Sequence, residues 1–458
     1  MNTQPANLLL SVSVLAAYLI MCFGIWRGTL ARRRALAHLA SGQAGGPAPV
    51  LVAHASQTGT AEGIAVQTAD ALQAAGVNVV LRSLSQLDQA TLQSSSEVLF
   101  IVSTYGEGDP PDAAASFVAK LMREPIDLAR LRFGMLALGD RAYRNFCGFG
   151  HHLEAWLLLQ GANALFARIE VDRGDSKAIA AWRHELSHIA ATTDLPEWQD
   201  LPFESWTLRK RTHLNPGSQG APVFHLELTP RNAAGKDWQA GDLLQVQVPT
   251  DPQRPRDYSI ASIPADGAVH LLVRLEIRED GGSGGASGWL THELPVNAML
   301  RARLRAHSQF RIGANTTRDL ILIGNGTGLA GLRAHLRQRA VQATGHAPAP
   351  RHWLLFGERQ AARDALYAEE LETWRQAGLI TQLDLVYSRD GGEHRYVQER
   401  LRAQGKQLQE WIASSAAILV CGSLDGMAEG VAEVLREQLG DELVAQLQQE
   451  GRYLRDVY

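Results

Sequence analysis

The order of apolar and polar positions divides the chain into one long apolar segment followed by three patterned regions. Residues 8–26 read LLLSVSVLAAYLIMCFGIW and contain no charged residue and no proline. In a helix at about 1.5 Å per residue, this segment spans about 29 Å, the thickness of the hydrocarbon core of a bilayer. The segment therefore predicts a transmembrane helix, and residues 1–26 a membrane anchor.

Charges on either side of the apolar segment predict its orientation. Residues 1–7 carry no charged side chain, whereas Arg27 and Arg32 to Arg34 follow the segment. The positive-inside rule then places the N-terminus outside and the rest of the chain in the cytoplasm, as expected of a single-pass protein of a bacterial inner membrane. A cleaved signal peptide is the alternative, but its basic n-region is missing. Residues 27–49, basic and then rich in Gly and Pro, predict a flexible tether.

Two regions alternate short apolar runs with helical patterns. In residues 50–193 and again in residues 316–458, this alternation predicts a doubly wound parallel sheet. The expected strands are residues 50–54, 77–81, 97–102 and 134–138 in the first region, and 320–324, 353–357, 383–388 and 418–422 in the second.

The region between them has a different pattern. Residues 194–205 break the periodicity with two prolines, Pro196 and Pro202, and predict a linker. Residues 206–315 then carry apolar or alternating runs at 223–229, 243–248 and 269–274, with Gly and Pro between them. This pattern predicts an antiparallel β-barrel, so the fold class is multidomain α/β with a central barrel.

Composition excludes several classes of protein. The chain has 44 Lys and Arg against 48 Asp and Glu, a net charge of −4, so no basic excess is present to bind nucleic acid. Its three cysteines, Cys22, Cys147 and Cys421, do not have metal-ligand spacing. A disulfide framework and a zinc or iron–sulfur site are therefore not expected, and no metal site is predicted.

Loops after the strands of the first region carry candidate ligand-binding residues. The loop from Ser56 to Thr60 joins hydroxyls and backbone N–H groups at a helix N-terminus, which suits a phosphate monoester; a helix cap without a ligand is the alternative. The next two loops add aromatic walls around the same strand ends. Together they predict a slot for FMN, formed by Ser56, Gln57, Thr58, Gly59, Thr60, Ala61, Ser103, Thr104, Tyr105, Gly106, Leu138, Gly139, Asp140, Tyr143, Phe146 and Cys147.

These three loops, in this order, resemble the FMN domain of the diflavin reductases, and the resemblance continues through Gly150 and Gly161. The resemblance implies a flavodoxin-like fold for residues 50–193.

The barrel region carries a candidate dinucleotide site. Arg256 and Tyr258 are two positions apart on a strand and project from one face, where a guanidinium beside a ring suits a dinucleotide; an ordinary surface pair is the alternative. A glycine-rich cradle follows about 28 residues later. This pairing resembles the FAD-binding barrel of the ferredoxin–NADP reductases, which implies binding by Arg256, Asp257, Tyr258, Ser259, Gly284, Gly285, Ala286 and Ser287.

The last region begins with a candidate nucleotide loop, Ile323 to Gly328, between a strand and a helix. The motifs at 356–359, 387–390, 395–398 and 452–458 resemble the NADPH module of the sulfite reductase flavoprotein subunit and of the reductases of microsomal haem monooxygenases. The resemblance implies that NADPH binds at Gly326, Thr327, Gly328, Ser388, Arg389, His394, Arg395, Tyr396 and Gln398.

Carried to the whole chain, the resemblance implies an NADPH-dependent FAD/FMN oxidoreductase. Hydride would pass from NADPH to FAD, and electrons would then pass singly through FMN to an acceptor. Ser259, Cys421 and Asp456 would lie near the reactive nitrogen of FAD, and Tyr458 would stack on its ring. A buried structural role is the alternative for Cys421.

The sequence departs from the family in several places. His394 stands where a lysine is usual, Asn325 and Gly331 where proline is usual, and Gly430 near a usual aspartate. Relatives also insert a helical connecting domain before the Arg-x-Tyr-Ser motif, for which the chain leaves no room.

The predicted acceptor is a redox protein in or near the membrane, with a haem protein favoured by the anchor. Three alternatives stay open: a ferric-chelate or quinone-type flavin reductase, a component of sulfite reductase, and a flavin-binding scaffold or redox sensor without catalysis.

Overall fold

The computed structural model describes residues 48–192, 195, 198, 202–232, 237–278, 281–342 and 350–458. The predicted transmembrane helix, nearly all of the tether and much of the predicted linker lie outside these residues. Among the helices that are described, none combines the length and the apolar character needed to cross a membrane.

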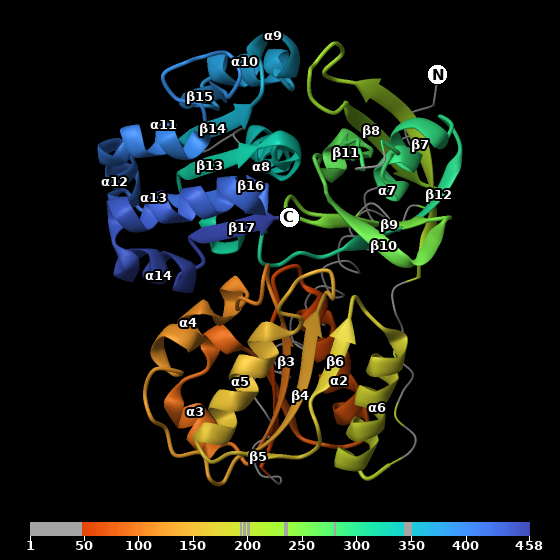
Figure 1. The fold of residues 1–458 in the computed structure, drawn as a ribbon, viewed down its shortest axis with the longest axis vertical. Coiled ribbons are helices and arrows are strands. Elements are labelled where there is room, and N and C mark those ends of the chain that lie inside the picture. The colour runs from red at the N-terminus through yellow and green to blue at the C-terminus, as the bar shows by residue number, and fades with distance from the viewer. Residues whose placement is uncertain are drawn as a thin grey trace, which may run out of the picture.

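The first of three sheets is parallel and lies in the lower half of Figure 1. Its strand order is β2-β1-β3-β4-β5, with β6 also paired to β4. All six residues of β1 are buried because helices cover both faces of the sheet. Its elements are β1 Val50–Ala55, α2 Thr60–Ala74, β2 Val79–Ser83, α3 Gln89–Ser94, β3 Glu97–Ser103, α4 Asp112–Lys120, β4 Arg132–Gly139, α5 Gly148–Leu159, β5 Asn163–Ala164, β6 Ile169–Asp172 and α6 Ser176–Ile189.

The second sheet is antiparallel, with the order β10-β9-β12-β7-β8-β11. A bridge between Ile260 and Leu271 brings its two ends together, so the sheet curls into a half-barrel around Trp206 and its apolar neighbours. Only residues 249 and 250 separate β9 from β10, so this hairpin holds no connecting domain. The elements are β7 Glu204–His213, β8 Val223–Pro230, β9 Leu243–Val248, β10 Asp251–Ser259, β11 Val269–Arg274, α7 Gly285–Gly288 and β12 Met299–Arg305.

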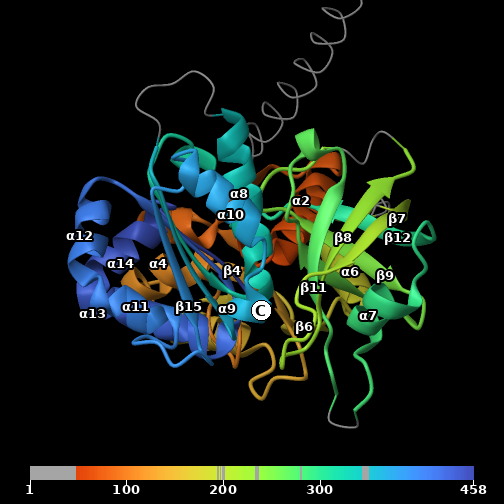
Figure 2. The same cartoon turned by 90° about the horizontal axis from the view of Figure 1, so that it is seen from above.

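The third sheet is parallel, with the order β15-β14-β13-β16-β17, and Figure 2 shows it beside the half-barrel. The C-terminal residues form its edge strand, β17, in register with β16. Its elements are β13 Leu320–Asn325, α8 Leu329–Gln342, β14 His352–Glu358, α9 Ala361–Asp364, α10 Ala368–Gln376, β15 Gln382–Tyr387, α11 Val397–Ala403, α12 Gly405–Ala413, β16 Ala417–Gly422, α13 Glu429–Leu439, α14 Asp441–Gln449 and β17 Tyr453–Val457.

The first sheet docks against both of the others. Helix α4 lies beside α14 in Figure 1, and Lys120 Nζ donates to Gln449 Oε1 at 2.7 Å across this boundary. Arg455 of β17 forms an ion pair with Asp112 at the start of α4. These contacts place the loops at the carboxyl ends of the first sheet against the other two sheets.

Candidate functional site

Three predicted catalytic residues meet where the half-barrel joins the third sheet. Ser259 ends β10, and Cys421 and Asp456 face each other in the paired strands β16 and β17. The Ser259 hydroxyl donates to Asp456 Oδ2 at 2.6 Å, and the Cys421 thiol donates to the same oxygen at 3.6 Å. The sequence-predicted grouping is therefore present in the structure, although the catalytic role itself stays a prediction.

The electrostatics of this cluster keep the thiol protonated. Cys421 is fully buried, and burial together with the neighbouring Asp456 carboxylate raises the pKa of its thiol well above the usual value. A Cβ on Gly331 would lie 3.2 Å from Cys421 Sγ and 2.9 Å from the Phe310 ring. Glycine at 331 therefore lets α8 approach the thiol closely, which explains this departure from the family pattern.

The terminal residue closes one side of the cluster. Two hydrogen bonds fix the backbone of Tyr458. Its N–H donates to Gly422 O at 3.1 Å, and its backbone oxygen accepts from Leu424 N at 3.0 Å. Its side chain is 58% exposed, and the hydroxyl lies 3.0 Å from Thr327 Oγ1. A fixed backbone with an exposed ring fits the predicted stacking residue.

A cleft of about 690 Å³ opens next to Tyr458. Arg395 Nε donates to Ser388 O at 3.4 Å on its wall, and Asn325 Oδ1 accepts the Ser423 N–H at 2.9 Å, which ties the ends of β13 and β16 together. The cleft is lined by Tyr458 and by six of the nine residues predicted to bind NADPH: Gly326, Thr327, Ser388, Arg395, Tyr396 and Gln398.

Three predicted nucleotide-binding residues do not line this cleft, and two unpredicted arginines do. Arg389 is exposed and His394 is half-buried outside the cleft, while Gly328 is buried, and a Cβ at this position would clash with Cys421 O and Gly422. Arg274 and Arg359 line the cleft instead. The cationic groups that face a bound nucleotide thus come partly from the half-barrel, which sequence motifs alone did not indicate.

The loop after β1 forms a cradle that fits a phosphate group. Ser56 Oγ accepts the Ala61 N–H at 3.2 Å, and the hydroxyls of Thr58 and Thr60 lie 3.5 Å apart. Gly59 has a φ of +84°, a left-handed conformation that glycine adopts without strain. The loop therefore presents hydroxyls and free N–H groups at the start of α2, as a phosphate monoester requires.

The neighbouring loops fit the ring system of the predicted FMN. The buried hydroxyls of Thr104 and Tyr105 have no hydrogen-bond partner among the described residues, so a ligand could satisfy them. Tyr143 is 44% exposed, and the guanidinium of Arg141 lies 4.2 Å from the centre of the Phe146 ring.

Two other residues of the predicted FMN slot, Asp140 and Cys147, make local contacts, and their part in FMN binding stays a prediction. Asp140 Oδ1 accepts the Ala142 N–H at 2.7 Å, which shapes the loop between Leu138 and Phe146. Cys147 is buried and its thiol donates to Ala137 O at 3.3 Å. Burial raises the pKa of Cys147 to about 12, so this thiol is an inert part of the core beneath the slot.

Strand β10 presents two faces to two different neighbours. Arg256 is on one face with Tyr258, and its side chain is 47% exposed, with a terminal nitrogen 3.9 Å from Asp251 Oδ2. A Cβ on Gly285 would meet open space, whereas Ser287 Oγ accepts the Glu276 N–H at 3.0 Å and anchors the short helix α7. An exposed guanidinium with a glycine cradle fits a pyrophosphate. The other face carries Asp257 and Ser259.

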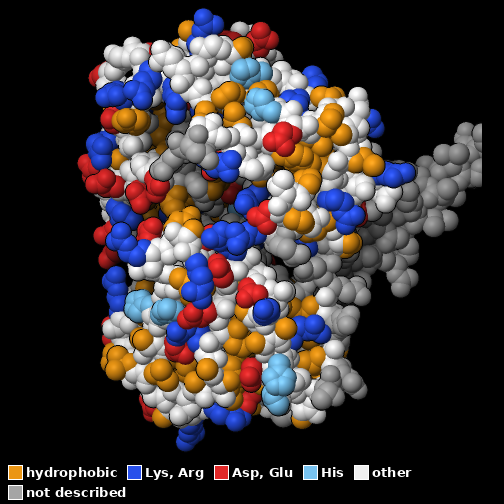
Figure 3. Space-filling view, turned by 45° about the vertical axis from the view of Figure 1, so that its right-hand side comes forward, with side chains coloured by type: hydrophobic (Ala, Val, Ile, Leu, Met, Phe, Trp, Pro, Cys, Tyr) orange, Lys and Arg blue, Asp and Glu red, His pale blue; other side chains and the backbone are white. Residues whose placement is uncertain are grey.

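Four residues absent from the sequence-based set join the sheets at this site. Arg305 of β12 contacts both Asp257 and the loop at Thr58. His307 Nε2 lies 3.0 Å from Gln57 O, and Asp112 pairs with Arg455. Figure 3 shows acidic and basic side chains interspersed where the lower and upper parts of the molecule meet. The one sequence signal for these contacts is the alternation of arginine and apolar residues in Arg301-Ala-Arg303-Leu-Arg305, which is typical of a strand with arginines on one face.

Comparison with known proteins places these domains in a family. Residues 52–182 match the family described as Flavodoxin, and residues 322–433 match the one described as Oxidoreductase NAD-binding domain. Along most of its length, the chain is similar to sulfite reductase [NADPH] flavoprotein alpha-components. Those of Vibrio cholerae and Escherichia coli K12 are each 26% identical, covering 92% and 89% of the chain and 90% of each relative. That of Yersinia pestis is 27% identical, covering 90% of both chains.

The chain is a divergent diflavin reductase. It combines the flavodoxin and the ferredoxin reductase-like NAD-binding domains of this family and is distantly related to the sulfite reductase flavoprotein. The predictions of an NADPH-dependent oxidoreductase and of FMN, FAD and NADPH as its cofactors are confirmed.

This diflavin reductase is shorter than its relatives. Its alignment with the Vibrio cholerae protein runs over 558 positions although the chain has only 458 residues, so at least 100 positions of the relative (558 − 458) have no counterpart. The two-residue β9–β10 turn is consistent with the loss of the connecting domain. Direct contacts between the sheets therefore position the FMN-binding loops.

A cluster of His225, Glu227 and His270 in this diflavin reductase has its ligand atoms within 4.8 Å of one another. Other side chains already contact these groups, since His225 Nδ1 lies 2.6 Å from Tyr367 Oη and Lys210 Nζ lies 3.3 Å from Glu227 Oε1. The cluster is therefore explained as a polar contact between the half-barrel and the third sheet.

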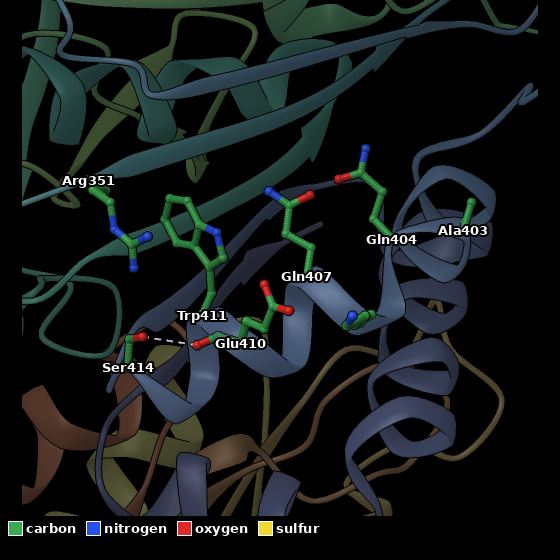
Figure 4. Close-up of a pocket in the computed structure, with 8 residues that line it drawn as sticks. Arg351, Ala403, Gln404, Gln407, Glu410, Trp411 and Ser414 are labelled. Carbon is green, nitrogen blue, oxygen red and sulfur yellow. Dashed lines mark hydrogen bonds between the residues drawn. The ribbon is translucent and has the colours of Figure 1, made fainter.

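A second cavity, of about 730 Å³, lies on α12 and is drawn in Figure 4. Arg351 and Trp411 flank it, with the guanidinium 4.5 Å from the centre of the indole ring. None of the predicted site residues lines this cavity. We assign it no part in the redox site.

Proposed function

We propose that this diflavin reductase passes electrons from NADPH through FAD and FMN to a redox protein held in or near a membrane. When bound, FAD supplies hydride acceptance from NADPH and FMN supplies single-electron transfer to the acceptor. The observation that carries the proposal is the meeting of the Ser259, Cys421 and Asp456 side chains. His307 joins this cluster to the FMN-binding loop, because its ring nitrogens lie 3.9 Å from Asp456 Oδ1 and 3.0 Å from Gln57 O.

Asp456 and Ser259 orient the nicotinamide in this proposal. Asp456 is only 6% exposed, so its carboxylate acts through a low local dielectric and would stabilise positive charge on a bound nicotinamide. The Ser259 hydroxyl fixes the carboxylate by donating to Oδ2. Tyr458 covers this place from the cleft side and moves aside when the nicotinamide enters.

Selection for NADPH rests on the polar wall of the cleft. Ser388, Arg395 and Tyr396 line it together, and a guanidinium binds a phosphate by paired hydrogen bonds. Arg389 and His394 lie near this wall on the exposed loop and add positive charge. We propose that these residues hold the 2′-phosphate and so favour NADPH over NADH.

The membrane part of the proposal rests on residues 8–26 and the arginines that follow them, which predict a single-pass anchor with the catalytic domains in the cytoplasm. A membrane haem protein suits such an anchor. The relatives are named as components of sulfite reductase, so a role as a sulfite reductase component is one alternative for this protein. A ferric-chelate or quinone-type reductase is the other.

The acceptor is tested with the full-length protein, reduced by NADPH without oxygen. The reduced protein is mixed with membranes of the source cells, with sulfite reductase haemoprotein, or with a soluble ferric chelate, and flavin reoxidation is followed. The proposal predicts the fastest reoxidation by membranes, and recovery of the protein in the membrane fraction. Fastest reoxidation by the haemoprotein or by the chelate contradicts it in favour of the corresponding alternative.

A further inference from the structure

We infer that Arg305 is a ligand of the FMN phosphate, supplied by the half-barrel across the boundary between two domains. This inference rests on the proposed binding of FMN at the loop after β1. It adds a phosphate-binding residue that lies outside the flavodoxin domain, and it makes FMN binding depend on how the domains are docked.

The phosphate loop itself lacks a cation. Residues 56–61 read SQTGTA and are followed by the acidic Glu62. A phosphate monoester carries a charge of about −1.5 to −2 at neutral pH. Hydroxyls and N–H groups can bind its oxygens, but the loop holds no Lys or Arg side chain to balance this charge.

Arg305 provides a cation at that loop. One of its terminal nitrogens, Nη2, donates to Thr58 O at 2.6 Å and to Thr58 Oγ1 at 3.1 Å, and it also contacts Thr60 Oγ1. The side chain is only 17% exposed. A phosphate held by the two threonine hydroxyls would therefore lie against this guanidinium, which has enough N–H groups to bind it and a protein group together.

The other terminal nitrogen of Arg305 pairs with Asp257, next to Tyr258 in β10. Asp257 and Tyr258 point to opposite faces of the strand because side chains alternate. The strand that is proposed to bind FAD therefore also positions, through Asp257, the arginine that contacts the FMN loop.

The residues after Arg305 follow the same loop closely. A Cβ on Gly59 would lie 3.0 Å from Ala306 O, His307 Nε2 lies 3.0 Å from Gln57 O, and Ser308 Oγ donates to Glu62 Oε2 at 2.6 Å. Docking of the two domains thus completes the phosphate site. By linkage, a ligand that binds the docked form more tightly also favours docking.

The experiment compares FMN with riboflavin, which has the same ring system without the phosphate. FMN is removed from the full-length protein, and each flavin is titrated back while its fluorescence is followed. The variants are Arg305→Ala, Arg305→Lys and, as a matched control, Arg301→Ala, which removes an exposed arginine from the same strand. Retained FAD reports that each variant is folded.

We expect Arg305→Ala to weaken FMN binding roughly tenfold to a hundredfold, the effect of losing a charge-assisted hydrogen bond, and to leave riboflavin binding within about twofold. Arg305→Lys should recover part of the loss, and Arg301→Ala should change neither. X-ray scattering should show that FMN, but not riboflavin, makes the wild-type protein more compact.

An equal loss for both flavins would show that Arg305 only supports the loop, and no loss for FMN would show that it does not contact the phosphate. Either result overturns the inference. Failure of the wild-type protein to bind FMN would instead contradict the proposed function.

Discussion

The ion pair between Arg455 and Asp112 gives the most direct prediction about domain docking. Arg455 Nε donates to Asp112 Oδ2 at 2.7 Å, and a second contact makes the pair bidentate. Each side chain is only 16% exposed. Gln57 adds a hydrogen bond to the same carboxylate at 3.1 Å, so the pair is continuous with the phosphate loop. Replacing Arg455 by Ala leaves this carboxylate buried without its cation.

The magnitude follows from that burial. Breaking a buried ion pair costs about 3–5 kcal/mol when the remaining charge cannot reach water. Here the domains can separate and expose Asp112, so the lower figure applies, and the docked form becomes about a hundredfold less favoured. The matched control is Lys120→Ala, which removes an exposed interdomain hydrogen bond of 2.7 Å and costs about 1 kcal/mol at most.

The assay follows both flavins after rapid mixing with NADPH in the absence of oxygen. We expect Arg455→Ala to reduce FAD at the wild-type rate but FMN far more slowly, together with a larger radius of gyration. Lys120→Ala should resemble the wild-type protein in both respects. If Arg455→Ala, with normal flavin content, reduces FMN within about twofold of the wild-type rate, direct docking through this pair does not control electron transfer.

Three further predictions concern hydride transfer, nucleotide choice and acid stability. Asp456→Asn should slow FAD reduction by NADPH roughly a hundredfold to a thousandfold with unchanged flavin content, measured by stopped-flow absorbance; an unchanged rate would remove Asp456 from the site. Arg395→Ala should raise KM for NADPH roughly tenfold and leave KM for NADH unchanged in steady-state assays, and equal changes would contradict a 2′-phosphate contact. Burial lowers the pKa of His352 to about 4, so the unfolded chain takes up a proton near pH 6.5 that the folded protein does not bind, and stability is lost as pH falls from about 6.5 to 4. His352→Gln should make this loss shallower by up to about 1.4 kcal/mol per pH unit in urea titrations, and an identical pH dependence would contradict it.

The sequence indicated the strands in which apolar residues predominate or alternate with polar ones. Residues 243–248 and 269–274 were predicted with the bounds that the structure shows for β9 and β11. Strands β7 and β12 were not predicted, because each has few buried residues among polar ones: β7 buries only Trp206 and Leu208, and β12 only Leu300 and Ala302. A half-barrel with one solvated or interdomain face produces such strands, and their charged residues hide the pattern.

Within the site, the family resemblance brought together residues that lie far apart in the chain. Ser259 and Asp456 were predicted to meet, and they do so at 2.6 Å. Arg305 and Arg455 were not predicted, because their contacts with Thr58 and Asp112 join the first domain to the half-barrel and to the third sheet. Such contacts arise from the docking of whole domains, which residue spacing within one loop does not encode.

The measurement that tests the central claim most directly is anaerobic reduction of the purified full-length protein by NADPH, with both flavins quantified beforehand. The account predicts one FMN and one FAD per chain, with FAD reduced first and FMN reduced afterwards in the isolated protein, without a connecting domain or a partner. Reduction of FAD alone would contradict the direct docking described here. Reduction of neither flavin by NADPH or NADH would contradict the oxidoreductase itself.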